Sequence, residues 1–216
     1  MQQIPDWYDP GISRVYSMGI MNDTLEPLDC VFSSEYEDAY IQGLLPNGRI
    51  IYEPFDPSVE VIRDYIRLHP TCRVVLNLVE QAHIYFVGLE IVHGKIHTIH
   101  LFDTDEHSIL SQASEENVVF LMNALLRLPP SPTTVFQDHS MPLQECEQEE
   151  RFHGGFCRAW ALLFAETFCR DGGEGLDDLW EELIEMEPEE RADMIFQYWE
   201  DKVEANILSN LTLLQL

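Results

Sequence analysis

The sequence is poor in basic residues. Only 12 of its 216 residues are Lys or Arg, against 39 Asp or Glu, and the formal net charge is -27 at pH 7. A chain with so much negative charge repels nucleic-acid backbones and anionic membrane surfaces. We therefore expect no direct nucleic-acid partner and no membrane partner. The same negative charge favours solubility and is compatible with the binding of basic protein partners.

Long apolar runs and CxxC pairs are also missing. No stretch approaches the roughly 18 apolar residues of a membrane span, and the opening MQQIPDWYDPG lacks the basic and apolar regions of a secretory signal. The five cysteines are irregularly spaced, which argues against a zinc site. We expect no metal and no other cofactor, and an intracellular, reducing location in the cytoplasm or nucleus.

The apolar pattern predicts an α+β fold in a single domain that spans residues 1–216. No internal repeat or low-complexity linker divides the chain, and its length suits one compact domain. Apolar spacing and breaker residues predict helices at 57–68, 114–128, 157–169, 176–186 and 188–206. β-Branched and apolar runs predict strands at 73–79, 84–92, 96–102 and 133–137. Together they indicate a mixed, mainly antiparallel sheet flanked by helices.

The stretch RFHGGFCRAWALLF, residues 151–164, places a cysteine where two glycines meet a predicted helix. Cys157 would lie at the positive end of that helix, where free N–H groups stabilise a thiolate and can bind an oxyanion. Gly154 and Gly155 would let a substrate backbone approach closely. Trp160 would pack so that it fixes the helix start. The alternative is that Cys157 is a small buried core residue.

The predicted hairpin offers a base for this cysteine. If HGK at 93–95 forms a three-residue turn, His83 lies opposite Asp105, and Asp103 is its diagonal neighbour on the same face. Two carboxylates would then come within reach of one imidazole, which a carboxylate can orient and hold in its charged form. A two-residue turn would instead place Thr104 opposite His83 and turn His83 away from Asp103.

The order of His83, Asp103, a glutamine-containing segment and Cys157 resembles that of the Ulp-type cysteine peptidases, the superfamily of SUMO proteases and the adenovirus protease. The run RVVLNLVEQAHIYFVGLEIVHGKIHTIHLFDT is similar to the family's strands around its histidine and acid. GGFCRAWALLF is most similar to a branch found in large DNA viruses. The resemblance covers about residues 55–170, with an acidic helical extension over 174–216. It implies a papain-like cysteine peptidase fold in permuted His-Asp-Gln-Cys order.

The resemblance also implies a role for each matching residue. His83 would be the base and Cys157 the nucleophile. Asp103 would be the acid that orients His83, with Asp105 as the alternative. A glutamine amide before the cysteine would donate to the oxyanion; it would be Gln144, with Gln148 as the alternative.

Substrate-binding residues are expected next to these groups. Ile84 follows the histidine, where the Ulp family has a tryptophan that walls the tunnel for a Gly-Gly tail. This difference argues against SUMO-like specificity more than against the chemistry. The predicted substrate-binding residues are Ile84, Gly154, Gly155 and Trp160.

These residues predict a cysteine peptidase that uses a Cys-His-Asp triad. Its substrate would be a protein, such as a ubiquitin-like conjugate or a viral structural precursor, and its location would include a virus-infected cell or a virion. One alternative is an acyltransferase of the same superfamily, which the few basic residues disfavour because coenzyme A carries phosphates. The other is an inactive peptidase-like scaffold whose acidic helices bind basic partners.

Overall fold

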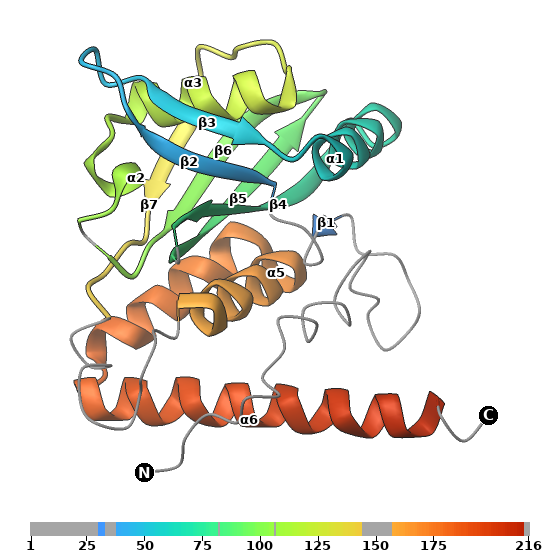
Figure 1. The fold of residues 1–216 in the computed structure, drawn as a ribbon, viewed down its shortest axis with the longest axis vertical. Helices are drawn as coiled ribbons and strands as arrows, with labels where there is room; N and C mark the ends of the chain where they lie inside the picture. Colours follow the sequence, from blue (N-terminus) through green and yellow to red (C-terminus); the bar gives the residue numbers. More distant parts are fainter. Residues whose placement is uncertain (1–29, 33–37, 82, 106, 144–156, 214–216) are drawn as a thin grey trace.

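The centre of the molecule is a mixed sheet. The computed structural model describes residues 30–32, 38–81, 83–105, 107–143 and 157–213. Across these residues the sheet has seven strands in the order β3-β2-β4-β5-β6-β7, with β1 paired to β4 (Figure 1). The strands are β1 (Cys30–Phe32), β2 (Ala39–Leu44), β3 (Ile50–Pro54), β4 (Cys72–Glu80), β5 (His83–Val92), β6 (Lys95–Phe102) and β7 (Val135–Asp138).

Helices cover both faces of the sheet. They are α1 (Asp56–Leu68), α2 (Ile109–Gln112), α3 (Glu115–Leu126), α5 (Cys157–Glu185) and α6 (Pro188–Leu213). One apolar core lies between the sheet and α1 and α3, and a second lies between the sheet and α5 and α6 (Figure 1). Among the described residues, no helix combines the length and the apolarity that a membrane crossing requires.

The sheet combines antiparallel and parallel neighbours. The longest ladders, β4 with β5 and β5 with β6, are antiparallel, as is β2 with β3. The pairs β1–β4, β2–β4 and β6–β7 are parallel. Strands β4 to β7 and helices α1 and α3 lie within a few residues of the predicted elements, whereas β1, β2, β3 and α2 were not predicted.

The turn between β5 and β6 differs from the prediction. Val92 pairs with Lys95, so the loop has two residues, His93 and Gly94, and not the three that were expected. Both have positive φ, 53° for His93 and 71° for Gly94. Positive φ at both central positions is the requirement of the type I′ turn, which matches the twist of the flanking strands. The three-residue turn was therefore wrong.

A bulge in β6 compensates for the shorter turn. The register shifts between Glu90 and Ile91, which leaves His97 as an extra residue in the ladder. Beyond this point Phe86 pairs with Phe102, the same register that a three-residue turn would have produced. One residue lost in the turn and one gained in the bulge cancel. The expected neighbours at the far end of the hairpin are thus restored.

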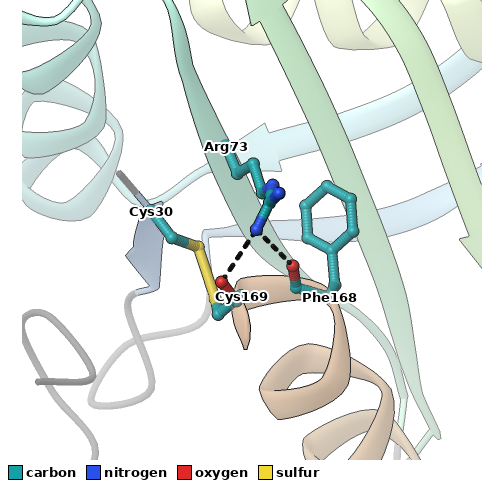
Figure 2. Close-up of a disulfide and its surroundings, with 4 residues drawn as sticks. All are labelled: Cys30, Arg73, Phe168 and Cys169. Atoms are coloured by element: carbon teal, nitrogen blue, oxygen red, sulfur yellow. Dashed lines mark hydrogen bonds between the residues drawn. A yellow bond between two sulfur atoms is a disulfide. The ribbon is translucent and has the colours of Figure 1, made fainter. Parts of the chain in front are cut away.

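Helix α5 covers the two predicted helices, 157–169 and 176–186, which the structure joins across a kink. It continues to Glu185 with a kink at Gly172, where φ is 76° and ψ is -156°. At the kink, the Arg73 guanidinium of β4 donates to the carbonyls of Phe168 and Cys169 (Figure 2). These bonds satisfy carbonyls that the kink releases from the helix. The helix that begins with Cys157 is therefore anchored to β4 at its kink.

A disulfide joins the same place to β1. Cys30 is bonded to Cys169, across a sequence separation of 139 residues (Figure 2). This pairing was not predicted from the sequence. Disulfides are rare in reducing compartments, so the bond weighs against the cysteine-based argument for a reducing location.

Candidate active site

The site forms where β5 begins and β6 ends. His83 is the first residue of β5, and Asp103 directly follows β6. Nε2 of His83 lies 2.6 Å from Oδ1 of Asp103, and the two side chains are 13% and 0% exposed. With the compensated register of the hairpin, this diagonal contact is the one expected from the sequence.

Cys157 approaches the same imidazole from the opposite face of the sheet. It is the first residue of α5 and is buried, and its side chain hydrogen-bonds with His83. Because Asp103 engages Nε2 of His83, Nδ1 is the ring nitrogen left to exchange a proton with the thiol. A helix start also presents backbone N–H groups and a partial positive charge, both of which favour a thiolate.

The protonation of His83 is set by opposing effects. Burial alone would lower the pKa of His83, but its hydrogen bonds and charge interactions with Asp103 and Cys157 raise that pKa to about 10. The imidazole is therefore held as an imidazolium at neutral pH. An imidazolium between a carboxylate and a thiol is the arrangement that supports a thiolate nucleophile.

Asp103 is held by more than the histidine. Its Oδ1 also accepts the backbone N–H of Asp105 over 2.9 Å. Its Oδ2 accepts the hydroxyls of Ser108 and Ser111. Ser108 is the N-cap of α2, and its Oγ accepts the N–H of Ser111 over 3.2 Å. Every lone-pair direction of this buried carboxylate is thus occupied, as a buried charge requires.

Tyr85 and Glu80 support this network. The Tyr85 ring stands edge-on to the His83 ring, with centroids 5.0 Å apart. Its hydroxyl donates to Glu80 and lies beside Ser108. Burial and the bond to Glu80 raise the pKa of the Tyr85 phenol, so it remains a donor. Oε2 of Glu80 accepts the N–H of Ile109 over 3.0 Å, which fixes the start of α2 against β4.

Three other predicted residues lie near the site with different surroundings. The Asp105 carboxylate accepts the N–H of His107 over 2.9 Å, in a local turn. Ile84 is half-buried and packs against the core beneath α5. Trp160 is 2% exposed and packs against Phe102, so it is a core residue that positions α5. This packing is the role expected of Trp160 at the helix start, and its contact with substrate stays a prediction.

Four predicted residues cannot be placed. Gln144 and Gln148, the candidate oxyanion donors, and Gly154 and Gly155, the glycines before the cysteine, lie outside the described residues.

A pair of histidines lies apart from this site. His100 and His139 stack in the core, with Nδ1 of His100 3.3 Å from Nε2 of His139. Burial lowers the pKa of both, and that of His100 falls to about 4. They are neutral packing groups at neutral pH. Within the described part of the chain, no cluster of His, Cys, Asp or Glu is arranged to hold a metal ion.

Sequence reasoning missed Ser108, Ser111, Tyr85 and Glu80. A signal for the serines was present in the sequence. Ser108 and Ser111 are three residues apart, a spacing that allows Ser108 to cap a short helix whose start lies next to Asp103.

No protein-family model matches the chain, and no curated protein matches it either.

Proposed function

We propose that the chain is a cysteine peptidase in which Cys157 is the nucleophile, His83 the general base and acid, and Asp103 the residue that orients His83. The observation that carries this proposal is that the His83 ring forms hydrogen bonds with two partners. They are Asp103, through Nε2, and the Cys157 side chain. A helix-start thiol, an adjacent imidazole and a buried carboxylate are the three parts that thiol catalysis needs.

In the proposed reaction the Cys157 thiolate attacks the carbonyl carbon of the scissile amide. A C–S bond forms, and the oxygen takes the negative charge, which the backbone N–H at the start of α5 can stabilise. The His83 imidazolium donates its proton to the leaving amine as the C–N bond breaks, and a thioester remains.

Neutral His83 then takes a proton from water, which attacks the thioester. The acid is released, and Cys157 and His83 return to the thiolate and imidazolium. Asp103 keeps its bond to Nε2 throughout, so the ring presents Nδ1 to each reacting proton.

The order of the three residues along the chain supports a permuted papain-like fold of the Ulp type. His83 begins one strand, Asp103 ends the next and Cys157 opens a later helix, on a mixed sheet flanked by helices. The proposed substrate is a protein cleaved after a small residue, such as a ubiquitin-like conjugate or a viral precursor. An intracellular location belongs to the same proposal, and the Cys30–Cys169 disulfide argues against a strongly reducing one.

The first test is selective alkylation. Iodoacetamide at neutral pH should label Cys157 faster than Cys72, which is also buried and outside the disulfide. Tryptic mass spectrometry locates the label. A His83→Gln variant should lose the advantage of Cys157, because the thiolate loses its counter-ion. Labelling of Cys157 no faster than that of Cys72 would contradict the proposal and favour an inactive acidic scaffold.

The second test is turnover. Fluorogenic peptides with Gly-Gly or Gly-X before the reporter should be hydrolysed by the wild type and not by Cys157→Ala. A Cys72→Ala variant is the matched control, because it removes a buried thiol of β4 that lies outside the site. Cleavage that persists in Cys157→Ala would rule out the proposed nucleophile.

A further inference from the structure

The most elaborate feature of the site is the set of bonds behind the acid. Asp103 is 1% exposed, and its Oδ2, the oxygen that does not face His83, accepts two hydroxyls. Both come from one short segment, because Ser108 caps the four-residue helix α2 and Ser111 lies within it. We propose that Ser108 and Ser111 are positioning residues that lock the Asp103 carboxylate in the orientation and charge state that His83 needs. This inference rests on the proposed function.

The hydrogen-bond directions support this role. Oγ of Ser108 accepts the N–H of Ser111, which directs its single proton to Asp103. The Ser111 hydroxyl reaches both Oδ2 of Asp103 and the Asp105 carbonyl, 3.1 Å away. Two donors on one oxygen fix the rotation of the carboxylate. Rotation of the carboxylate would carry Oδ1 away from Nε2 of His83.

The second effect is on charge. A buried carboxylate without donors takes up a proton readily, because burial penalises its charged form. Here the imidazolium proton next to the carboxylate is the one on Nε2 of His83, and Nε2 lies 2.6 Å from Oδ1 of Asp103. The two serine donors stabilise the carboxylate and so keep that proton on the ring. The imidazolium and its attraction for the Cys157 thiolate then both persist.

The serines are themselves held in place. Glu80 of β4 accepts the N–H of Ile109, and Tyr85 of β5 contacts Ser108. Glu80 and Tyr85 thus hold the start of α2 in place, and hydrogen bonds run from Ser108 through Asp103 to His83. The titratable groups around His83 are Asp103 directly after β6, Cys157 on α5, Tyr85 on its own strand and Glu80 on β4 beyond it.

Three variants separate positioning from helix capping. Ser111→Ala removes one donor and leaves the cap of α2 intact. Ser108→Ala removes a donor and the cap, whereas Ser108→Thr keeps a hydroxyl that can serve both purposes. Ser131→Ala is the matched control, because its hydroxyl bonds only to Thr133, in the loop before β7.

The measurement is the pH titration of the His83 ring by NMR, together with the alkylation rate of Cys157 against pH. In Ser111→Ala and Ser108→Ala, the midpoint of His83 should fall by about one pH unit, the effect of one lost bond to a charged group. The alkaline limb of any peptidase activity should move in the same direction. Ser108→Thr and Ser131→Ala should titrate like the wild type.

The outcomes distinguish the two proposals. If wild-type His83 is neutral at pH 7 and Cys157 shows no selective alkylation, the proposed function fails. If the wild type shows the imidazolium and the selective thiolate, but both alanine variants titrate unchanged, the proposed function stands and the positioning role is overturned. A fall in stability without a change in the His83 midpoint would also overturn it, because it would show a capping role alone.

Discussion

The Arg73 guanidinium donates a hydrogen bond to the Cys169 carbonyl over 3.0 Å, at the far end of the helical segment that begins with Cys157. Carbonyls at a helix end carry partial negative charge, so a cation there is favourable. The disulfide to Cys30 fastens the same residue to β1 (Figure 2). The segment that carries the proposed nucleophile is thus held to two strands, and its start is fixed against β5.

Replacement of Gly172 by alanine should destabilise the fold. At φ 76° and ψ -156° this residue has a backbone conformation that is almost restricted to glycine, and a Cβ would lie 2.7 Å from the Arg73 guanidinium. We expect a loss of about 1–3 kcal/mol in the free energy of unfolding, measured in urea.

Two other glycines separate the causes of that loss. Gly94→Ala has a positive φ of 71° but nothing within 4 Å of its Cβ, so it tests backbone strain alone. Gly43→Ala has neither a positive φ nor a close neighbour and should be nearly neutral. Equal losses for Gly172→Ala and Gly94→Ala would show that contact with Arg73 contributes nothing.

Removal of the disulfide should also lower stability. Loss of a native disulfide typically costs about 2–5 kcal/mol, and the Cys30–Cys169 bond closes a long loop. The free energy of unfolding of the wild type should fall when a reductant is added. Cys30→Ser should start from the lower value and show no response to reductant. A wild type that is unaffected by reductant would contradict this prediction.

The two carboxylates next to His83 should differ in their effect on turnover. Asp103 contacts the ring, whereas the Asp105 side chain bonds to the backbone of His107. We expect Asp103→Asn to reduce peptide hydrolysis by on the order of 100-fold, because proton transfer depends on the orientation of His83. Asp105→Asn keeps a turn-forming side chain and should change the rate by only a few-fold. The opposite result would assign the orienting role to Asp105.

Stability should fall as the solution becomes alkaline. The pKa of His83 rises from its ordinary 6.5 to about 10 in the folded chain. Between these values the His83 ring holds a proton in the folded chain that it does not hold in the unfolded chain, so the contribution of this ring to stability decreases with rising pH. The contribution is complete below about pH 6.5 and is lost as the pH passes about 10.

The measurement is urea unfolding at about pH 7 and about pH 10. The wild type should lose more free energy of unfolding between these values than His83→Gln, which lacks the ring. Equal losses would mean that the folded site does not hold an extra proton on His83.

Much of the frame around the site is readable from local sequence. The apolar runs of β4, β5 and β6 are long and β-branched, and α1 and α3 carry clear start signals. These elements place His83 and Asp103 at one end of a hairpin. The glycine-to-helix transition likewise predicted that α5 would begin at Cys157.

The rest depends on contacts that are distant in sequence. Strand β2 is short, contains Gly43 and pairs with β4, which lies more than 30 residues further on. The kink at Gly172 is stable because Arg73 from β4 fills it, and nothing near residue 172 encodes that arginine. The α2 segment has only four helical residues, too few for a periodic pattern.

The contact between His83 and Asp103 depends on the number of residues in the β5–β6 hairpin, because the bulge at His97 offsets the two-residue turn. Successive side chains of a strand point to opposite faces, so the insertion or deletion of one residue in the β5–β6 hairpin would send Asp103 into the core beneath α5. Thr104 would then face His83, although every member of the proposed triad would still be present in the sequence. Over evolution, this hairpin can therefore change length freely only in steps of two residues, or through paired changes in turn and bulge.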